Sequence, residues 1–131
     1  MNMQKKLLIL VPGLLCDDAL WAHQSEFLSD IADFEIAETT LDDNLADMAR
    51  RILETAPPRF ALAGLSMGGY VSLEIMRQAP ERVSRLALLD TSASPDDETR
   101  ASRRRGLIEL AEKGRFKGVT PRLLPLFTRC E

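Results

Sequence analysis

The chain has 131 residues, with 17 basic and 20 acidic side chains and a net charge of −3. This length allows one domain at most, short for an α/β enzyme, and the near balance of charge excludes the electrostatic footprint of a nucleic-acid-binding protein. Hydrophobic residues make up 45% of the sequence, enough for a packed core and too much for a disordered chain.

The N-terminal segment imitates a secretory signal, because Lys5 and Lys6 precede an apolar run. Pro12 and Gly13 interrupt that run, and no small-residue cleavage site follows. No other segment approaches the ~18 consecutive apolar residues of a membrane span. We therefore expect a soluble, cytoplasmic protein with no membrane partner. The widely spaced Cys16 and Cys130 agree with reduced thiols rather than a disulfide scaffold.

Residues 1–94 alternate short apolar runs with helical patterns, which is typical of a parallel sheet with helices on its faces. The predicted strands are residues 7–11, 34–37, 60–65 and 85–89. The fold class is therefore α/β, with a three-layer, doubly wound parallel sheet. Each strand–helix–strand unit should cross over with the right-handed sense.

Three helices are expected between and after these strands. The first presents one apolar face, formed by Leu20, Trp21, Gln24, Phe27, Leu28 and Ile31. The second presents Leu45, Met48, Ala49, Ile52, Leu53 and Ala56, with Asp42 or Asp43 as its N-cap and Pro57-Pro58 as its end. The third carries Val71, Leu73, Ile75 and Met76 and ends at Pro80.

From residue 95 the pattern changes to a helix that no strand follows. Acidic residues at its start suit the helix dipole, and Gly114 is a plausible end. The arginines that follow, Arg100, Arg103, Arg104 and Arg105, are interpreted as a solvated helix face. A further helical or turn segment is expected from Thr120-Pro121. We assign residues 1–94 to the α/β core and residues 95–131 to the beginning of a helical cap.

The segment Gly64-Leu65-Ser66-Met67-Gly68 lies between the third predicted strand and the helix after it. A serine hydroxyl is a poor nucleophile until a base takes its proton, so chemistry requires that it be held at an exposed, sharp turn. Glycines on either side permit such a turn, because a side chain at Gly64 or Gly68 would collide where strand and helix meet. The segment is therefore interpreted as a nucleophile elbow.

Several segments, in order, resemble the N-terminal half of an α/β-hydrolase-fold serine hydrolase. They are Leu-Ile-Leu-Val-Pro-Gly-Leu-Leu at residues 8–15, Trp21 and Gln24, Ala-Gly-Leu-Ser-Met-Gly-Gly-Tyr at residues 63–70, Arg82-Val83, and Leu-Ala-Leu-Leu-Asp at residues 86–90. That family usually has His-Gly in the loop after the first of these strands, and this chain has Pro12 in place of the histidine. The departure affects the shape of the loop and not its chemistry, since the family uses a backbone N–H there.

The resemblance implies a hydrolase that acts on a carboxylic ester or related acyl substrate without a cofactor or a metal. Ser66 matches the nucleophile. The backbone N–H groups of Met67 and Leu14 match the two donors of the oxyanion hole, and the helix that begins at Met67 adds its dipole. Loss of one such donor typically costs about 2.7–4 kcal/mol of transition-state stabilisation.

The base that the resemblance requires is a histidine downstream of the serine, and this sequence has only His23, upstream of it. We expect a solvated or capping role for His23. Asp90 follows a predicted strand and is a candidate acid, although a turn-forming role is favoured. Cys16 is near the predicted oxyanion loop, where it is interpreted as a small apolar filler.

These observations predict that the 131 residues are the front portion of a longer hydrolase, truncated inside its cap and inactive alone. Strand 85–89 would then be an unpaired apolar edge. We expect a second polypeptide carrying the C-terminal half, or a second copy of the chain, to cover it. A non-catalytic interaction protein that keeps the front half of the fold is an alternative, as is an acyltransferase or C–C hydrolase.

Overall fold

The computed structural model describes residues 5–118 and residue 121. The chain divides into two compact units, Met1–Ala93 and Ser94–Glu131. The first unit holds a parallel sheet with its helices, and the second holds α4 (Glu98–Glu112). No helix among the described residues is both long and apolar enough to cross a membrane.

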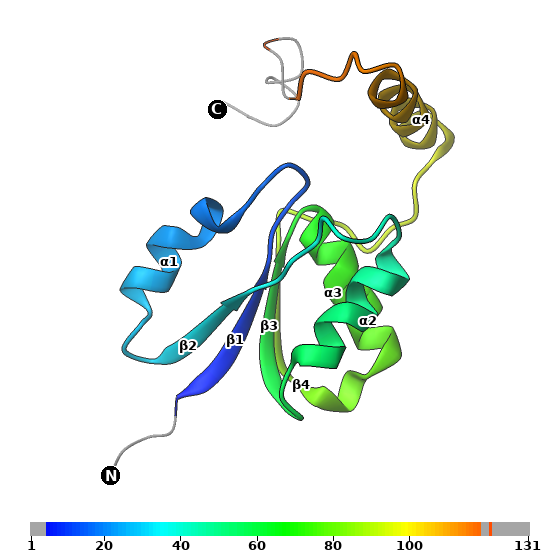
Figure 1. Ribbon diagram of the computed structural model, residues 1–131. Coiled ribbons are helices and arrows are strands. Elements are labelled where there is room, and N and C mark those ends of the chain that lie inside the picture. Colours follow the sequence, from blue (N-terminus) through cyan, green and yellow to red (C-terminus); the bar gives the residue numbers. More distant parts are fainter. Residues whose placement is uncertain (1–4, 119–120, 122–131) are drawn as a thin grey trace. The chain divides into compact units, whose positions relative to one another are not determined.

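Four parallel strands form the sheet in the order β2-β1-β3-β4 (Figure 1). They are β1 (Lys6–Val11), β2 (Ala32–Ile36), β3 (Phe60–Leu65) and β4 (Val83–Leu89). All four predicted strands are therefore confirmed, with shifted ends in all but β3. Because each crossover returns the chain to the same edge, the loops after β1, β3 and β4 meet at the carboxyl ends of the strands.

Helices cover both faces of the sheet, which confirms the three-layer α/β class. The 3₁₀ turn η1 (Asp18–Trp21) and α1 (Ala22–Phe27) lie on one face, and α2 (Leu45–Thr55) and α3 (Met67–Gln78) lie on the other (Figure 1). A second 3₁₀ turn, η2 (Pro80–Arg82), leads from α3 into β4.

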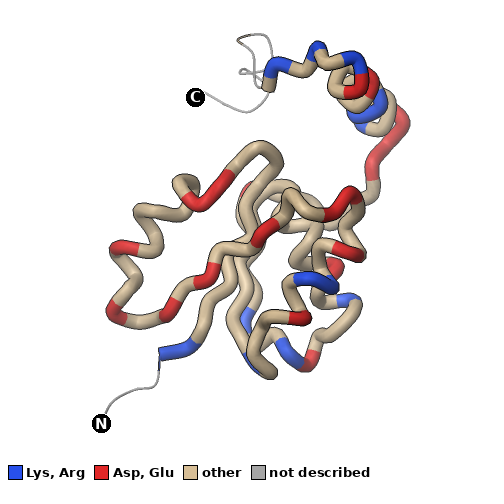
Figure 2. Tube along the Cα trace, viewed as in Figure 1, with Lys and Arg blue, Asp and Glu red and all other residues tan. Residues whose placement is uncertain are grey.

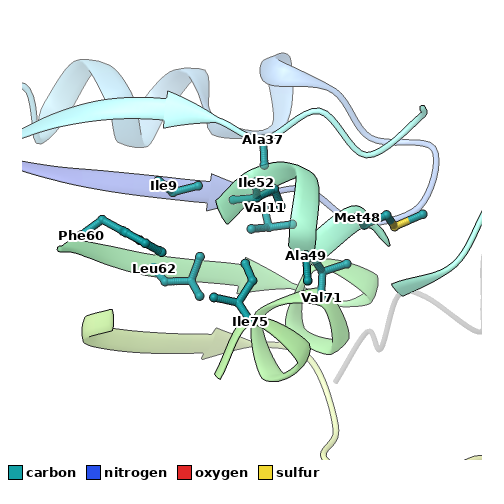
Figure 3. Packing of buried hydrophobic residues seen from close by; sticks show 10 residues of the cluster. All are labelled: Ile9, Val11, Ala37, Met48, Ala49, Ile52, Phe60, Leu62, Val71 and Ile75. Atoms are coloured by element: carbon teal, nitrogen blue, oxygen red, sulfur yellow. The ribbon is translucent and has the colours of Figure 1, made fainter. Parts of the chain in front are cut away.

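The main core lies between the sheet and the α2–α3 layer. Figure 3 shows its buried members, which are Ile9, Val11, Ala37, Met48, Ala49, Ile52, Phe60, Leu62, Val71 and Ile75. A smaller cluster of Leu10, Trp21 and Ala63 forms on the α1 side. Side chains of a strand alternate between faces, so β3 sends Leu62 to one core and Ala63 to the other.

The predicted buried face of the first helix is wrong from Gln24 onward, because Gln24, Phe27 and Leu28 are all exposed. The helix has only six residues, and Phe27 and Ile31 are 70% and 68% exposed. The chain turns at Leu28, whose carbonyl accepts the N–H groups of Ile31 and Ala32 at 3.0 and 3.1 Å. That turn starts β2 at Ala32, two residues earlier than predicted, so no helical turn remains to carry Ile31 to the sheet.

The predicted N-cap of α2 is also wrong by one or two residues. Asn44 is the cap, and its side-chain oxygen accepts the N–H of Asp47 at 2.9 Å. Asp42 instead forms an ion pair with Arg51 at 2.6 Å, and that hydrogen bond lowers the pKa of the Asp42 carboxyl. The ends of α2 before Pro57-Pro58 and of α3 before Pro80 are confirmed.

In the second unit, the side chain of Asp97 caps α4 by accepting the N–H of Arg100 at 2.8 Å. No residue of α4 is buried, and Arg104 and Arg105 pair with Asp96 and Glu98 at 2.7 and 2.6 Å, as a solvated face requires. Gly114 follows the helix with a positive φ of 64°. The segment predicted from Thr120 and the thiol of Cys130 lie outside the described residues, and the assignment of a cap stays a prediction.

Candidate active site

Ser66 stands at the junction of β3 and α3 in a strained backbone conformation. Its φ is 54° and its ψ is −116°. A side-chain-bearing residue in such a region costs of order 1–3 kcal/mol and persists only where its surroundings enforce it. The Ser66 side chain is exposed and makes no capping hydrogen bond to α3. The hydroxyl is therefore presented outward at a sharp turn.

Backbone contacts hold Ser66 on both sides of its α-carbon. Its N–H donates to the carbonyl of Leu89, at the end of β4, over 3.0 Å. Its carbonyl accepts the N–H of Gly69 at 2.9 Å and the hydroxyl of Thr91 at 2.8 Å. The turn is thus fixed by the adjacent strand as well as by the first turn of α3.

Gly64 and Gly68 lie where backbone segments pack too closely to admit a side chain. A Cβ at Gly68 would lie 2.7 Å from the carbonyl carbon of Val11 and 2.8 Å from the carbonyl oxygen of Pro12. A Cβ at Gly64 would lie 2.5 Å from the carbonyl carbon of Gly68. Real Cβ atoms essentially never approach closer than 3.0 Å. The collision predicted where strand and helix meet is therefore confirmed at Gly64, whereas an added carbon at Gly68 collides instead with the end of β1 and the loop after it.

The loop after β1 lies directly against this turn. A Cβ at Gly13 would be 3.5 Å from the Cβ of Ser66. The loop closes with a hydrogen bond from the N–H of Cys16 to the carbonyl of Gly13 at 3.1 Å, and Leu15 has a φ of 60°. Leu14, the residue after Gly13, is 61% exposed.

Two backbone N–H groups consequently belong to segments that meet at Ser66. Met67 is the first residue of α3, so its N–H has no acceptor within the helix and lies at the positive end of the dipole. Leu14 belongs to the loop that contacts Ser66 through Gly13. Such a pair of segments can stabilise negative charge that develops on a substrate oxygen near the serine.

The other candidate residues lie as follows. Asp90 is exposed directly after β4, and its φ of 44° turns the chain back towards α3. His23 is exposed in α1, and its ring packs against Phe27 with centroids 4.3 Å apart. Cys16 is a half-buried free cysteine whose thiol donates to the carbonyl of Leu14 at 3.6 Å.

A pocket of about 390 Å³ lies between the loop after β1 and the segment after β2. Its lining is Pro12, Cys16, Asp17, Asp18, Ile36, Ala37, Glu38, Thr39 and Thr40. Hydrogen bonds from the hydroxyl and the N–H of Thr40 lower the pKa of Glu38. The lining is therefore anionic at neutral pH. Residues 7–49 contain no lysine or arginine, and Figure 2 shows the acidic residues that are spread along this part of the chain.

Sequence reasoning did not identify Thr91 as part of the site. The available signal was a small hydroxyl residue immediately beyond the carboxyl end of a strand, where functional side chains gather in parallel sheets. No group of three or more His, Cys, Asp or Glu side chains suited to a metal ion occurs within the described part of the chain.

The chain is similar in sequence and in structure to known proteins, among them two esterases. The pimeloyl-acyl-carrier protein methyl ester esterase of Vibrio parahaemolyticus is 26% identical over 129 residues, which are 92% of this chain and 45% of that protein. A thermophilic esterase from Thermogutta terrifontis matches with a TM-score of 0.64 and 27% identity over 83% of this chain and 46% of that one. MenH from S. aureus matches with a TM-score of 0.67 and 20% identity over 86% and 50%.

The chain thus spans about half the length of the curated relatives and solved structures that it matches. The solved structures that it matches are of the α/β-hydrolase fold. The family model described as putative esterase matches residues 24–123. The chain belongs to that putative esterase family and has an α/β-hydrolase fold.

Proposed function

We propose that this chain carries the nucleophile and the oxyanion hole of an ester hydrolase, with Ser66 as the nucleophile. The observation that carries the proposal is the conformation of Ser66, an exposed serine in a strained turn between strand and helix. Strained residues of this kind gather at active sites, where neighbouring structure maintains them. The hydrogen bonds from Gly69 and Thr91 supply that support.

In the proposed reaction the Ser66 hydroxyl attacks the carbonyl carbon of an ester while a base accepts its proton. The carbonyl oxygen becomes an oxyanion, to which Met67 and Leu14 donate their N–H groups. The alcohol leaves, and water then releases the acyl group from Ser66. The side chains of Met67 and Leu14 need only the correct shape, because the backbone N–H groups of these residues donate the hydrogen bonds to the oxyanion.

We propose that the base is supplied from outside these 131 residues. The single histidine, His23, contacts Phe27 on the exposed surface of α1, so nothing in its surroundings supports a role at Ser66. Asp90 remains a candidate for the acid that orients such a histidine, because it follows the strand whose end bonds to Ser66.

The partner that brings the base would also cover β4. In this outer strand the side chains of Leu86, Leu88 and Leu89 are 38%, 41% and 40% exposed. An open apolar edge strand pairs readily with further strands. We therefore propose a second polypeptide that contains the histidine and pairs with β4. A stable dimer of the chain alone, with no histidine-bearing companion, would instead favour a non-catalytic interaction protein.

The proposed substrate is a neutral carboxylic ester. The name of the Vibrio relative specifies a methyl ester, which supports a small alcohol as the leaving group. The anionic pocket beside the oxyanion loop disfavours a substrate carboxylate there, because Asp17, Asp18 and Glu38 would repel it. Comparison of p-nitrophenyl acetate with a p-nitrophenyl ester that ends in a carboxylate tests this preference.

Imidazole can replace the missing base in a direct test of Ser66. We expect only trace hydrolysis of p-nitrophenyl acetate by the purified chain, and a rate increase with imidazole that exceeds the increase in Ser66→Ala. His23→Ala should match the unaltered chain at every imidazole concentration. Identical imidazole curves for the chain and Ser66→Ala would contradict the proposal. Robust turnover without imidazole that both substitutions abolish would restore His23 as the base.

A further inference from the structure

We infer that Thr91 is a positioning residue that holds Ser66 in the orientation needed for attack; this inference rests on the proposed function of Ser66. The Thr91 hydroxyl donates to the carbonyl of Ser66 at 2.8 Å. Two residues earlier, the carbonyl of Leu89 accepts the Ser66 N–H at 3.0 Å. Leu89 and Thr91, at and just after the end of β4, therefore form hydrogen bonds with the N–H and the carbonyl of Ser66.

Steric contact fixes the same geometry from a second direction. Thr91 lies so close to the first turn of α3 that a Cβ on Gly69 would be 2.6 Å from the Cβ of Thr91. The Gly69 N–H meanwhile donates to the same Ser66 carbonyl at 2.9 Å. Thr91 thus packs against Gly69, and both residues donate to the Ser66 carbonyl. A shift of the Thr91 side chain would therefore disturb the start of α3.

The chain turns directly after β4 to make this contact. Asp90 has a φ of 44°, a region that residues with side chains rarely occupy. The turn at Asp90 brings Thr91 back over the elbow instead of continuing along the strand. The Thr91 hydroxyl therefore connects the turn at Asp90 with the strained turn at Ser66.

Loss of the hydroxyl should affect the reaction more than the fold. The exposed turn at Ser66 would keep its hydrogen bonds to Gly69 and Leu89 and lose only the one to the Thr91 hydroxyl. A displacement of about 1 Å in a reacting group can cost roughly 100-fold in rate. A partly relaxed turn should therefore slow the attack by Ser66 about tenfold, while binding of a reagent is unchanged.

The chain contains a matched control at the other end of the same strand pair. Ser84, near the start of β4, donates its hydroxyl to the carbonyl of Phe60, at the start of β3, over 2.9 Å. The Ser84 hydroxyl donates from β4 to a carbonyl of β3, and the Thr91 hydroxyl donates from just after β4 to the carbonyl of Ser66, just after β3. Only the Thr91 bond reaches the elbow, so Ser84→Ala removes an equivalent contact without touching Ser66.

The test is the rate at which a fluorophosphonate modifies Ser66, followed by intact mass in the presence of imidazole. We expect Thr91→Ala and Thr91→Val to react about tenfold more slowly at saturating reagent, with an unchanged half-saturation concentration. Thr91→Ser and Ser84→Ala should react within twofold of the unaltered chain. The Ala and Ser variants differ only in the hydroxyl, so this pair keeps the test valid if Thr91→Val does not fold.

Amide hydrogen exchange tests the role of Thr91 independently of the proposed function of Ser66. The Ser66 and Gly69 N–H groups should exchange about tenfold faster in Thr91→Ala than in Thr91→Ser. Absence of any Ser66 adduct in the unaltered chain would count against the proposed function, and exchange would still decide the role of Thr91. Equal modification rates, or equal exchange at both amides, in the Ala and Ser variants would overturn the inference.

Discussion

A methyl group at Gly68 tests whether the turn at Ser66 is packed against the end of β1 and the loop after it. In Gly68→Ala the new carbon would meet the carbonyl carbon of Val11 at 2.7 Å and the carbonyl oxygen of Pro12 at 2.8 Å, whereas ordinary contact begins at 3.4 Å. Both neighbours are backbone atoms of β1 and its loop. They cannot rotate away as a flexible side chain would, so α3 and the loop after β1 must separate.

Over-packing of this kind costs about 1–3 kcal/mol and more where backbone must move. The close backbone contacts place Gly68→Ala at the upper end of this range, at about 3 kcal/mol. Alanine gains about 1 kcal/mol over glycine inside a helix, so we expect a net loss of about 2 kcal/mol. With a urea m-value of about 1–3 kcal/mol/M, the unfolding midpoint should fall by roughly 0.7–2 M.

Urea unfolding monitored by circular dichroism measures this change. The matched control is Gly106→Ala in α4, where an added Cβ meets nothing within 4 Å and should not lower the midpoint. A Gly68→Ala midpoint equal to or above that of the unaltered chain would refute the packing argument.

Substitutions at three further positions probe the fold. Ile75→Ala empties a fully buried position of the main core and should destabilise the chain by about 3 kcal/mol in urea unfolding; a loss below about 1 kcal/mol would contradict that core. Asn44→Ala removes the N-cap of α2 and should cost about 1 kcal/mol, whereas Asn44→Asp, which keeps an acceptor, should cost much less. Hydrogen bonds from Arg77 and then Gln78 lower the pKa of Glu74 from 4.5 to about 2. Because the folded pKa is the lower one, this contribution is intact above pH 4.5 and disappears as the pH falls towards 2. Arg77 is 70% exposed, so we expect only about 0.5 kcal/mol; stability curves of Glu74→Gln and the unaltered chain that run parallel over this range would rule the contribution out.

The two inner strands, β1 and β3, could be predicted because strands buried on both faces read as unbroken apolar runs. The run from Phe60 to Leu65 is the clearest case, and its predicted ends match β3. The same reasoning failed for α1, because apolar spacing says which residues share a helical face only if the helix continues. The turn at Leu28 is set by the position where β2 begins beside β1, a tertiary constraint.

The choice of cap in α2 shows the same limit on a smaller scale. Asp42, Asp43 and Asn44 are all good N-cap residues, so local chemistry does not choose among them. The ion pair between Asp42 and Arg51, nine residues away, removes one candidate. Within the site, the Gly-x-Ser-x-Gly motif predicted the turn at Ser66, but Thr91 reaches it from 25 residues along the chain.

Peptide mapping by mass spectrometry after fluorophosphonate treatment with imidazole tests whether Ser66, among the serines of the chain, is the nucleophile, as we propose. We expect one phosphonate per chain, on the peptide that contains Ser66, and no adduct in Ser66→Ala. Modification spread over exposed serines such as Ser29, at the same rate in Ser66→Ala, would contradict the proposed role of Ser66.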